Sequence, residues 1–138
     1  VLLDAGGFPA NVIFGEDMYV AAKMLNAGYK IAYAADACVY HSHDYSLIQE
    51  MKRYFDMGVF HAREPWIRAE FGGAEKEGAK FIVSEFKYLA RHAFWRIPEG
   101  MLRLVPRYAG FRLGLLEKYI PLIIKKKISM NPDYFKTV

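Results

Sequence analysis

Residues 46–59 read SLIQEMKRYFDMGV and predict the most regular element of this chain. Ser46 and Gln49 have the spacing of a capping box, in which a hydroxyl and an amide side chain satisfy free backbone donors at the start of a helix. Apolar side chains then recur at helical spacing as one stripe, formed by Leu47, Ile48, Met51, Tyr54, Phe55 and Val59. We therefore expect an amphipathic helix that begins after Ser46.

The residues that follow predict further helices. Gly72-Gly73 interrupts the chain, and apolar side chains at helical spacing indicate a second amphipathic helix across residues 79–93. Pro98 suits the first turn of a third helix, in which Pro106 is expected to cause a kink or a break. The second part of the chain is therefore expected to be mainly helical.

The first part of the chain has a mixed pattern. A Gly-rich stretch precedes an expected helix at residues 16–26, which Gly28 should end because glycine suits the left-handed conformation after a helix. Residues rich in Ile, Val and Tyr then predict two short strands, at 30–33 and 37–41. The sequence thus predicts an α/β fragment over residues 1–43 and a helical C-terminal extension over residues 44–138.

Composition excludes several classes of protein. The chain has 138 residues, of which 54% are hydrophobic, and a single cysteine, which argues against disorder and against a disulfide scaffold. Its longest run without Asp, Glu, Lys or Arg, at residues 5–15, falls well short of the ~18 apolar residues of a membrane-spanning helix. The chain begins at Val1 without an initiator Met or a recognisable signal, so we expect a fragment that has lost its beginning.

The formal net charge is +4, and the basic excess gathers in the last third of the chain. Lys125, Lys126 and Lys127 lie directly after the apolar residues 119–124, and Pro121 separates residues 115–119 from a short helix expected at 122–128. Apolar residues are numerous there, namely Phe111, Leu113, Leu115, Leu116, Tyr119, Ile120, Leu122, Ile123, Ile124 and Ile128. They can pack on the rest of the protein or a second subunit, or an interfacial helix can lie on an anionic membrane surface.

Two carboxylates, Glu16 and Asp17, open the first expected helix directly after Gly15. Acidic side chains commonly stabilise a helix N-terminus, by roughly 0.3 to 1 kcal/mol, which is the structural interpretation. The functional interpretation is that one carboxylate takes a proton from a substrate hydroxyl, because a general base must be held within reach of that hydroxyl.

Other residues allow a structural and a functional interpretation as well. His41 and His43 sit two apart at a strand end and can bind a divalent metal only if further ligands join them. Gly6-Gly7 can form a plain turn or let the backbone approach a phosphate. Cations and aromatics interleave further on and can bind phosphates and stack on sugars, or simply pack; they are Arg53, Tyr54, His61, Arg63 and Trp66.

Four segments together carry a resemblance, namely Gly6-Gly7-Phe8-Pro9, Phe14-Gly15-Glu16-Asp17, Asn26-Ala27-Gly28-Tyr29-Lys30-Ile31 and Val39-Tyr40-His41. In order and spacing they resemble the C-terminal part of the catalytic domain of family-2 inverting glycosyltransferases. Residues 41–47 and 52–61 resemble the bacterial rhamnosyltransferase-like members. The resemblance implies the C-terminal part of a GT-A nucleotide-sugar-binding fold.

The resemblance also implies roles for single residues. It makes Asp17 the catalytic base and places Glu16, Gly6 and Gly7 at the acceptor site. We expect Arg53 to bind the diphosphate of the donor. The resemblance implies that His41 helps to bind a divalent ion, Mg or Mn, whose main ligands are residues missing from this fragment. His43 receives no role.

The implied parent enzyme transfers a sugar, expected to be rhamnose, from a nucleotide-sugar donor to a glycan or lipid-linked acceptor with inversion. This activity belongs to bacterial cell surface polysaccharide biosynthesis, in the cytoplasm or peripherally on the inner face of the membrane, with no nucleic-acid partner. The family's nucleotide-binding half and Asp-x-Asp motif do not occur in this sequence, so the chain alone is expected to be inactive. The alternative is a non-enzymatic helical module that docks on a membrane surface or a protein partner.

Overall fold

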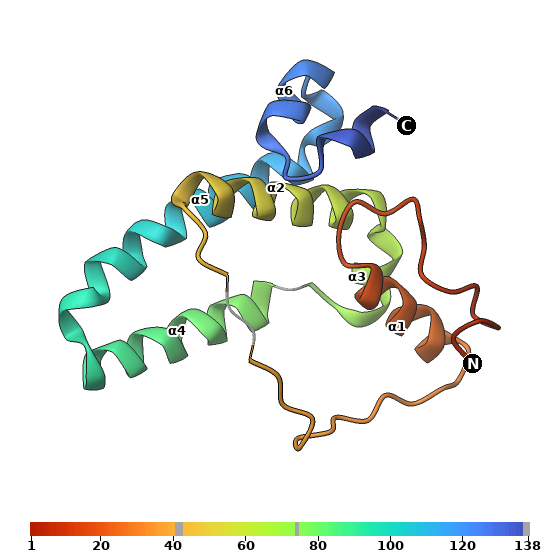
Figure 1. The fold of residues 1–138 in the computed structure, drawn as a ribbon, viewed down its shortest axis with the longest axis horizontal. Coiled ribbons are helices and arrows are strands. Elements are labelled where there is room, and N and C mark those ends of the chain that lie inside the picture. Colours follow the sequence, from red (N-terminus) through yellow and green to blue (C-terminus); the bar gives the residue numbers. More distant parts are fainter. Residues whose placement is uncertain (41–42, 74, 137–138) are drawn as a thin grey trace.

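The computed structural model describes residues 1–40, 43–73 and 75–136, without the side chains of residues 75–77. All regular elements in these ranges are helices (Figure 1). The α-helices are α1 Glu16–Asn26, α2 Leu47–Arg63, α3 Pro65–Phe71, α4 Glu75–His92, α5 Ile97–Leu115 and α6 Leu122–Ile128. Three short 3-10 helices are η1 Phe94–Arg96, η2 Glu117–Tyr119 and η3 Pro132–Lys136.

The expected α/β fragment of GT-A type is wrong, because the described part of the chain contains no strand. Residues 30–33 and 37–40 lie in an irregular segment between α1 and α2, with Tyr33 and Val39 94% and 86% exposed (Figure 1). A strand is stable only when a neighbouring strand pairs with its backbone, and no described segment offers that pairing. The Ile, Val and Tyr content alone therefore produces no sheet; residue 41 lies outside the described residues.

The helices follow the sequence more closely. Ser46 and Gln49 form the predicted capping box at the start of α2, and Gly28 follows α1 with φ 86°. Helix α4 confirms the second amphipathic helix, and α5 runs through Pro106 without a break. The short helix α3, which begins at Pro65 directly after α2, was not predicted.

Helix α2 occupies the centre and lies along α5 for most of its length (Figure 1). Glycines bring the two backbones together, since a Cβ atom on Gly110 or Gly114 would lie 2.2 Å from the carbonyl oxygen of Met51 or Phe55. A Cβ on Gly58, on the α2 side, would lie 2.3 Å from the carbonyl oxygen of Phe111. At this distance only residues without a side chain fit between the two helices.

An ion-pair cluster ties the same two helices at one end. Glu50 on α2 is 7% exposed and accepts hydrogen bonds from Arg103 Nη1 at 2.9 Å and from Arg107 Nε and Nη2, both at 3.1 Å. Burial raises the pKa of the Glu50 carboxyl, but hydrogen bonds and charge from Arg107 and Arg103 outweigh it, so this pKa lies below its ordinary value. Two arginines of the basic last third, Arg103 and Arg107, are therefore partly neutralised by a buried carboxylate.

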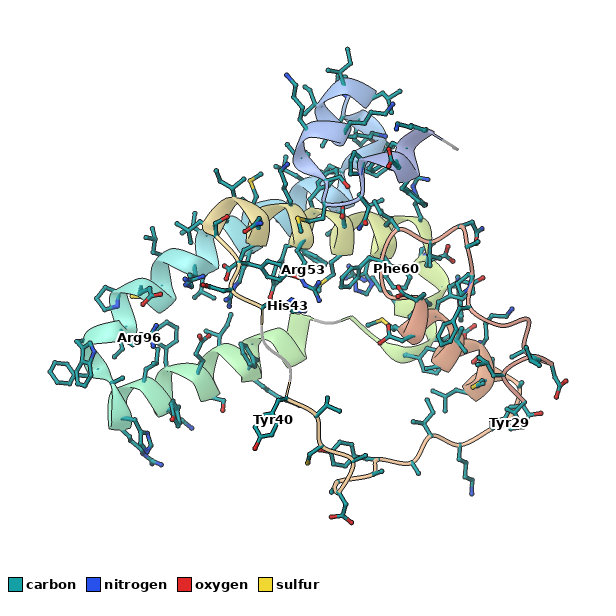
Figure 2. The ribbon with its side chains drawn as sticks, viewed as in Figure 1. Tyr29, Tyr40, His43, Arg53, Phe60 and Arg96 are labelled. Atoms are coloured by element: carbon teal, nitrogen blue, oxygen red, sulfur yellow. The ribbon has the colours of Figure 1, made fainter. Side chains whose placement is uncertain are left out.

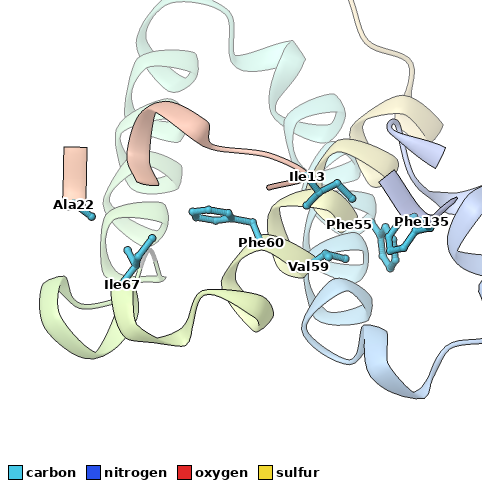
Figure 3. Close-up of a cluster of buried hydrophobic side chains, with 7 residues drawn as sticks. All are labelled: Ile13, Ala22, Phe55, Val59, Phe60, Ile67 and Phe135. Atoms are coloured by element: carbon cyan, nitrogen blue, oxygen red, sulfur yellow. The ribbon is translucent and has the colours of Figure 1, made fainter. Parts of the chain in front are cut away.

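The buried core lies on the other sides of α2 (Figure 3). Phe55, Val59 and Phe60 are at most 1% exposed. They meet side chains of the N-terminal loop, α1, α3 and the C-terminal segment, namely Ile13, Ala22, Ile67 and Phe135. Helix α2 thus serves as the shared packing surface for the N-terminal loop, α1, α3 and the C-terminal segment.

A second buried carboxylate fixes the C-terminal segment. Glu117 accepts a hydrogen bond from Arg63 Nε at 3.0 Å and pairs with Lys125, while Arg63 Nη1 donates to Tyr134 Oη at 3.1 Å. Burial raises the pKa of Glu117, but hydrogen bonds from Lys125 and Arg63 bring it below its ordinary value. Three apolar residues of α6, Leu122, Ile123 and Ile124, remain outside this packing, with Ile123 73% exposed, whereas Ile128 packs against the core.

We expect Gly114→Ala to destabilise the protein, because the new methyl group forces the backbones of α2 and α5 apart. The expected loss is at least about 2 kcal/mol in the free energy of unfolding, in the range typical of overpacked contacts. Urea unfolding followed by circular dichroism measures it. Gly78→Ala is the matched control, since a Cβ at this position of α4 meets nothing within 4 Å. Equal stabilities of the two variants would contradict a backbone contact between α2 and α5.

Acid should weaken the fold through Glu50. Because its folded pKa lies below the ordinary 4.5, the contribution of the ion pairs is complete above that pH and is lost as the pH falls through the folded pKa. Glu50→Gln should cost about 1.5 to 3 kcal/mol near neutral pH and flatten the loss of stability in acid. Unfolding experiments across the acid range measure both effects. Glu99→Gln, which removes an exposed partner of Arg103, should change the curve much less, because solvent screens that ion pair. Parallel acid curves for wild type and Glu50→Gln would contradict the prediction.

Candidate functional site

A pocket of about 560 Å³ opens between the N-terminal loop, α2 and the C-terminal segment. It is lined by Phe8, Ile13, Phe14, Gly15, Glu16, Asp17, Arg53 and Asn131. Three of the residues singled out in the sequence, Glu16, Asp17 and Arg53, therefore share one hollow, although two of them precede the irregular segment and the third follows it. The pocket holds two carboxylates, a guanidinium, an amide and two aromatic rings.

Gly15 sets the position of the two carboxylates. It caps α1 with φ 68° and ψ 35°, a left-handed conformation that other residues adopt only with strain, and a Cβ there would lie 3.5 Å from the Phe60 ring. The chain therefore turns directly from the loop into α1, and Glu16 and Asp17 stand in the first helical turn. Asp17 Oδ1 accepts a hydrogen bond from the backbone N–H of Met18 at 2.7 Å, which fixes one carboxylate oxygen.

Arg53 is held by aromatic rings. Its guanidinium carbon lies 5.0 Å from the centre of the Phe14 ring and 5.6 Å from that of Tyr45. His43 stacks on Tyr45 in turn, with ring centres 4.8 Å apart (Figure 2). Among the described residues no carboxylate pairs with Arg53, so its positive charge stays available to an anion, and a planar guanidinium can bind phosphate oxygens through two parallel hydrogen bonds.

Asn131 belongs to the pocket through its contacts with α2 and the N-terminal loop. Its Nδ2 donates to the backbone oxygen of Ile13 at 3.3 Å and to Asp56 Oδ2 at 3.0 Å, and Asp56 is fully buried. Burial raises the pKa of the Asp56 carboxyl, and hydrogen bonds from Ser129, Asn131 and Met130 only partly offset this effect. Neither Asn131 nor Asp56 was predicted as a site residue. The sequence signal for Asp56 is an aspartate among the buried positions of an amphipathic helix.

The other predicted site residues are Gly6, Gly7 and His41. Gly6 and Gly7 have φ angles of 91° and 67° in a turn closed by the hydrogen bond from Gly7 N–H to Leu2 oxygen at 2.9 Å, and they do not line the pocket. His41 lies outside the described residues. Within the described ranges, no group of three or more His, Cys, Asp or Glu side chains is placed to hold a metal ion.

The other cationic and aromatic residues near Arg53 take part in packing. His61 is buried between Phe60 and Phe111, with ring centres 5.3 and 5.9 Å away. Arg63 binds Glu117, as described above, and the Trp66 indole donates to Glu64 at 2.8 Å. Arg53 is the member of this group that reaches the pocket. A second hollow, of about 440 Å³, lies along α4 alone and brings no carboxylate with it.

Two proteins with curated names are similar to this chain. Over 133 residues it is 46% identical to the O-antigen chain rhamnosyltransferase WbaN of Salmonella anatum, a match that covers 96% of this chain and 42% of that protein. Over 138 residues it is 44% identical to the O-antigen chain rhamnosyltransferase RfbN of Salmonella typhimurium, covering all of this chain and 44% of that protein. The chain therefore spans less than half the length of these relatives.

No family model matches the chain, and no solved structure matches it. The similarity to WbaN and RfbN supports the relation to rhamnosyltransferases that the sequence motifs imply. Membership of glycosyltransferase family 2 stays a prediction.

Proposed function

We propose that this chain forms the acceptor-side part of a glycosyltransferase that transfers rhamnose from a nucleotide-sugar donor to a glycan or lipid-linked acceptor. The observation that carries the proposal is the pocket in which Glu16, Asp17 and Arg53 meet. Its chemistry suits the reaction, since a carboxylate can accept a hydroxyl proton while a guanidinium holds phosphate oxygens. The names of WbaN and RfbN, both O-antigen chain rhamnosyltransferases, support rhamnose as the sugar and O-antigen biosynthesis as the setting of this proposal.

In the proposed reaction, an acceptor hydroxyl attacks the anomeric carbon of the donor sugar. The Asp17 carboxylate takes the proton of that hydroxyl as the new carbon–oxygen bond forms. The bond between the anomeric carbon and the diphosphate oxygen breaks on the opposite face, which inverts the configuration, and the nucleoside diphosphate leaves with the electron pair. Arg53 binds the diphosphate, and Glu16 accepts a hydrogen bond from the acceptor sugar.

A divalent ion stays a prediction for the complete enzyme. The described residues bring two carboxylates, Glu16 and Asp17, to the pocket, and Mg²⁺ or Mn²⁺ needs further ligands that these residues do not provide. No step of the proposed reaction above therefore depends on a metal ion. Gly6 and Gly7 are proposed to act on the acceptor side indirectly, since Lys23 Nζ donates to the neighbouring Ala5 oxygen at 3.0 Å and ties their turn to α1.

The competing proposal is a helical module that docks on an anionic membrane surface. It draws on α6, where Leu122, Ile123 and Ile124 are 51%, 73% and 47% exposed beside Lys126 and Lys127. Among the described helices, none combines the length and the apolar character needed to cross a bilayer. Membrane docking by α6 does not by itself argue against the transferase proposal, since a lipid-linked acceptor would be found at the cytoplasmic face of a membrane.

Asp17→Asn should abolish transfer in the complete enzyme, because an amide keeps the shape of the carboxylate but cannot take the proton. We expect the rate to fall by about 100-fold to 10,000-fold while binding of a nucleoside diphosphate survives. Transfer from radiolabelled nucleoside-diphosphate rhamnose measures the rate, and calorimetric titration with dTDP and UDP measures the binding.

Two further variants sharpen this experiment. Arg53→Ala should weaken nucleoside-diphosphate binding, whereas Asp17→Asn should lower the transfer rate. The two variants thus distinguish a residue that binds the donor from one that takes part in proton transfer. Asp36→Asn changes an exposed aspartate outside the pocket and should leave both measurements unchanged. Near-normal turnover by Asp17→Asn would reject the base assignment.

Membrane docking is tested by changing Lys126 and Lys127 together to Gln. Lys125 is left in place because it pairs with the buried Glu117. Each basic residue near an anionic leaflet contributes about 1 kcal/mol, so the double variant should lose about tenfold or more in binding to anionic vesicles. Co-sedimentation with anionic and neutral vesicles measures this loss. Equal sedimentation of both proteins with anionic vesicles, or none by either, would favour packing of α6 on protein.

A further inference from the structure

We propose that Asn131 binds a hydroxyl group of the acceptor sugar through its Oδ1 atom, and that Asp56 is the positioning residue that orients it. The inference rests on the proposed function and adds a specificity-determining residue from the C-terminal segment. Neither residue belongs to the motifs on which the relation to glycosyltransferases depends.

The orientation of the Asn131 amide follows from its neighbours. The backbone oxygen of Ile13 and the Oδ2 atom of Asp56, which also accepts from the backbone N–H of Met130, both act as hydrogen-bond acceptors. The Asn131 nitrogen must therefore face them, and the two contacts use both of its hydrogens. The Asn131 Oδ1 atom is therefore free to accept a hydrogen bond from a ligand, because it receives none from the described part of the chain.

The position of Asn131 is fixed by further hydrogen bonds. Asp56 Oδ2 also accepts from the backbone N–H of Met130 at 3.0 Å, and the backbone N–H of Asn131 donates to Ser129 Oγ at 2.8 Å. Ser129 is 3% exposed. Because Asp56 is fully buried on α2, the amide at the pocket wall is anchored to the centre of the fold rather than to a free loop.

The neighbouring groups favour a sugar as the ligand of Oδ1. The pocket already holds an anion-binding guanidinium at Arg53, and its carboxylates at Glu16 and Asp17 repel a second anion. A neutral group that donates a hydrogen bond is therefore the best partner for Oδ1. Phe8, 59% exposed at the same pocket, offers an apolar surface to the C–H face of a pyranose ring.

The test compares hydroxyl recognition in wild type and Asn131→Ala. Binding of methyl glycosides of galactose, mannose, glucose and N-acetylglucosamine to the complete protein is measured by saturation-transfer NMR, and the tightest ligand is then replaced by its monodeoxy analogues. One deoxy analogue should bind wild type about fivefold to tenfold more weakly, as expected for one lost hydrogen bond. In Asn131→Ala the same analogue and its parent glycoside should bind equally.

Tyr134→Phe is the matched control for a purely structural role. It removes the hydrogen bond from Arg63 in the same C-terminal segment but does not touch the pocket. We expect it to lower thermal stability and to keep the deoxy penalty. Asn131→Gln, which retains the amide but moves it by one methylene, serves if Asn131→Ala does not fold, and it should also lose the penalty.

The outcomes separate this inference from the proposed function. An undiminished deoxy penalty in Asn131→Ala, or in Asn131→Gln, would overturn the inference, as would an equal loss in Tyr134→Phe. These binding measurements need no turnover, so they remain informative if the complete protein transfers no sugar. The converse result is an active enzyme in which Asn131→Ala raises the KM for the donor and leaves the KM for the acceptor unchanged. That result would refute the inference and leave the transferase proposal intact.

Discussion

The backbone contact between α2 and α5 is the constraint on which the rest of the structure depends. Three glycines, Gly58, Gly110 and Gly114, let the two backbones touch directly, so the helices have a single close arrangement rather than several loose ones. This fixes α2 on one side and leaves its other sides to receive the N-terminal loop and the C-terminal segment. The pocket exists because both of these segments pack on one helix that cannot shift.

The two buried carboxylates of α2 show two ways to place a polar group inside a small core. Glu50 stays ionised because two arginines of α5 surround it, so it reinforces the pairing of the helices. Asp56 has only uncharged donors around it, and its raised pKa reflects the cost of its burial. Its hydrogen bonds to Met130 and Asn131 hold the wall of the pocket on α2, which is the positioning role that we propose for it.

The sequence predicted the helices well because their signals are local. Ser46 and Gln49 are three residues apart, and the apolar stripe after them repeats within each turn. The prediction of strands at 30–33 and 37–41 was wrong for the described residues, because a strand needs a partner strand that local sequence cannot reveal. Glu16, Asp17 and Arg53 could be found from motifs and residue types, whereas Asn131 could not, since its importance comes from Ile13, 118 positions earlier in the chain.

This long-range contact also has a consequence for synthesis in the cell. A ribosome adds roughly 5 to 20 residues per second, and domains generally fold as they emerge. Asn131, which closes the pocket against Ile13, is made 118 positions after that residue, and therefore long after the neighbouring Glu16 and Asp17. A nascent chain released before residue 131 would carry both carboxylates without the wall that completes their pocket, so premature termination should remove the proposed acceptor site as a whole rather than alter its preference for one sugar.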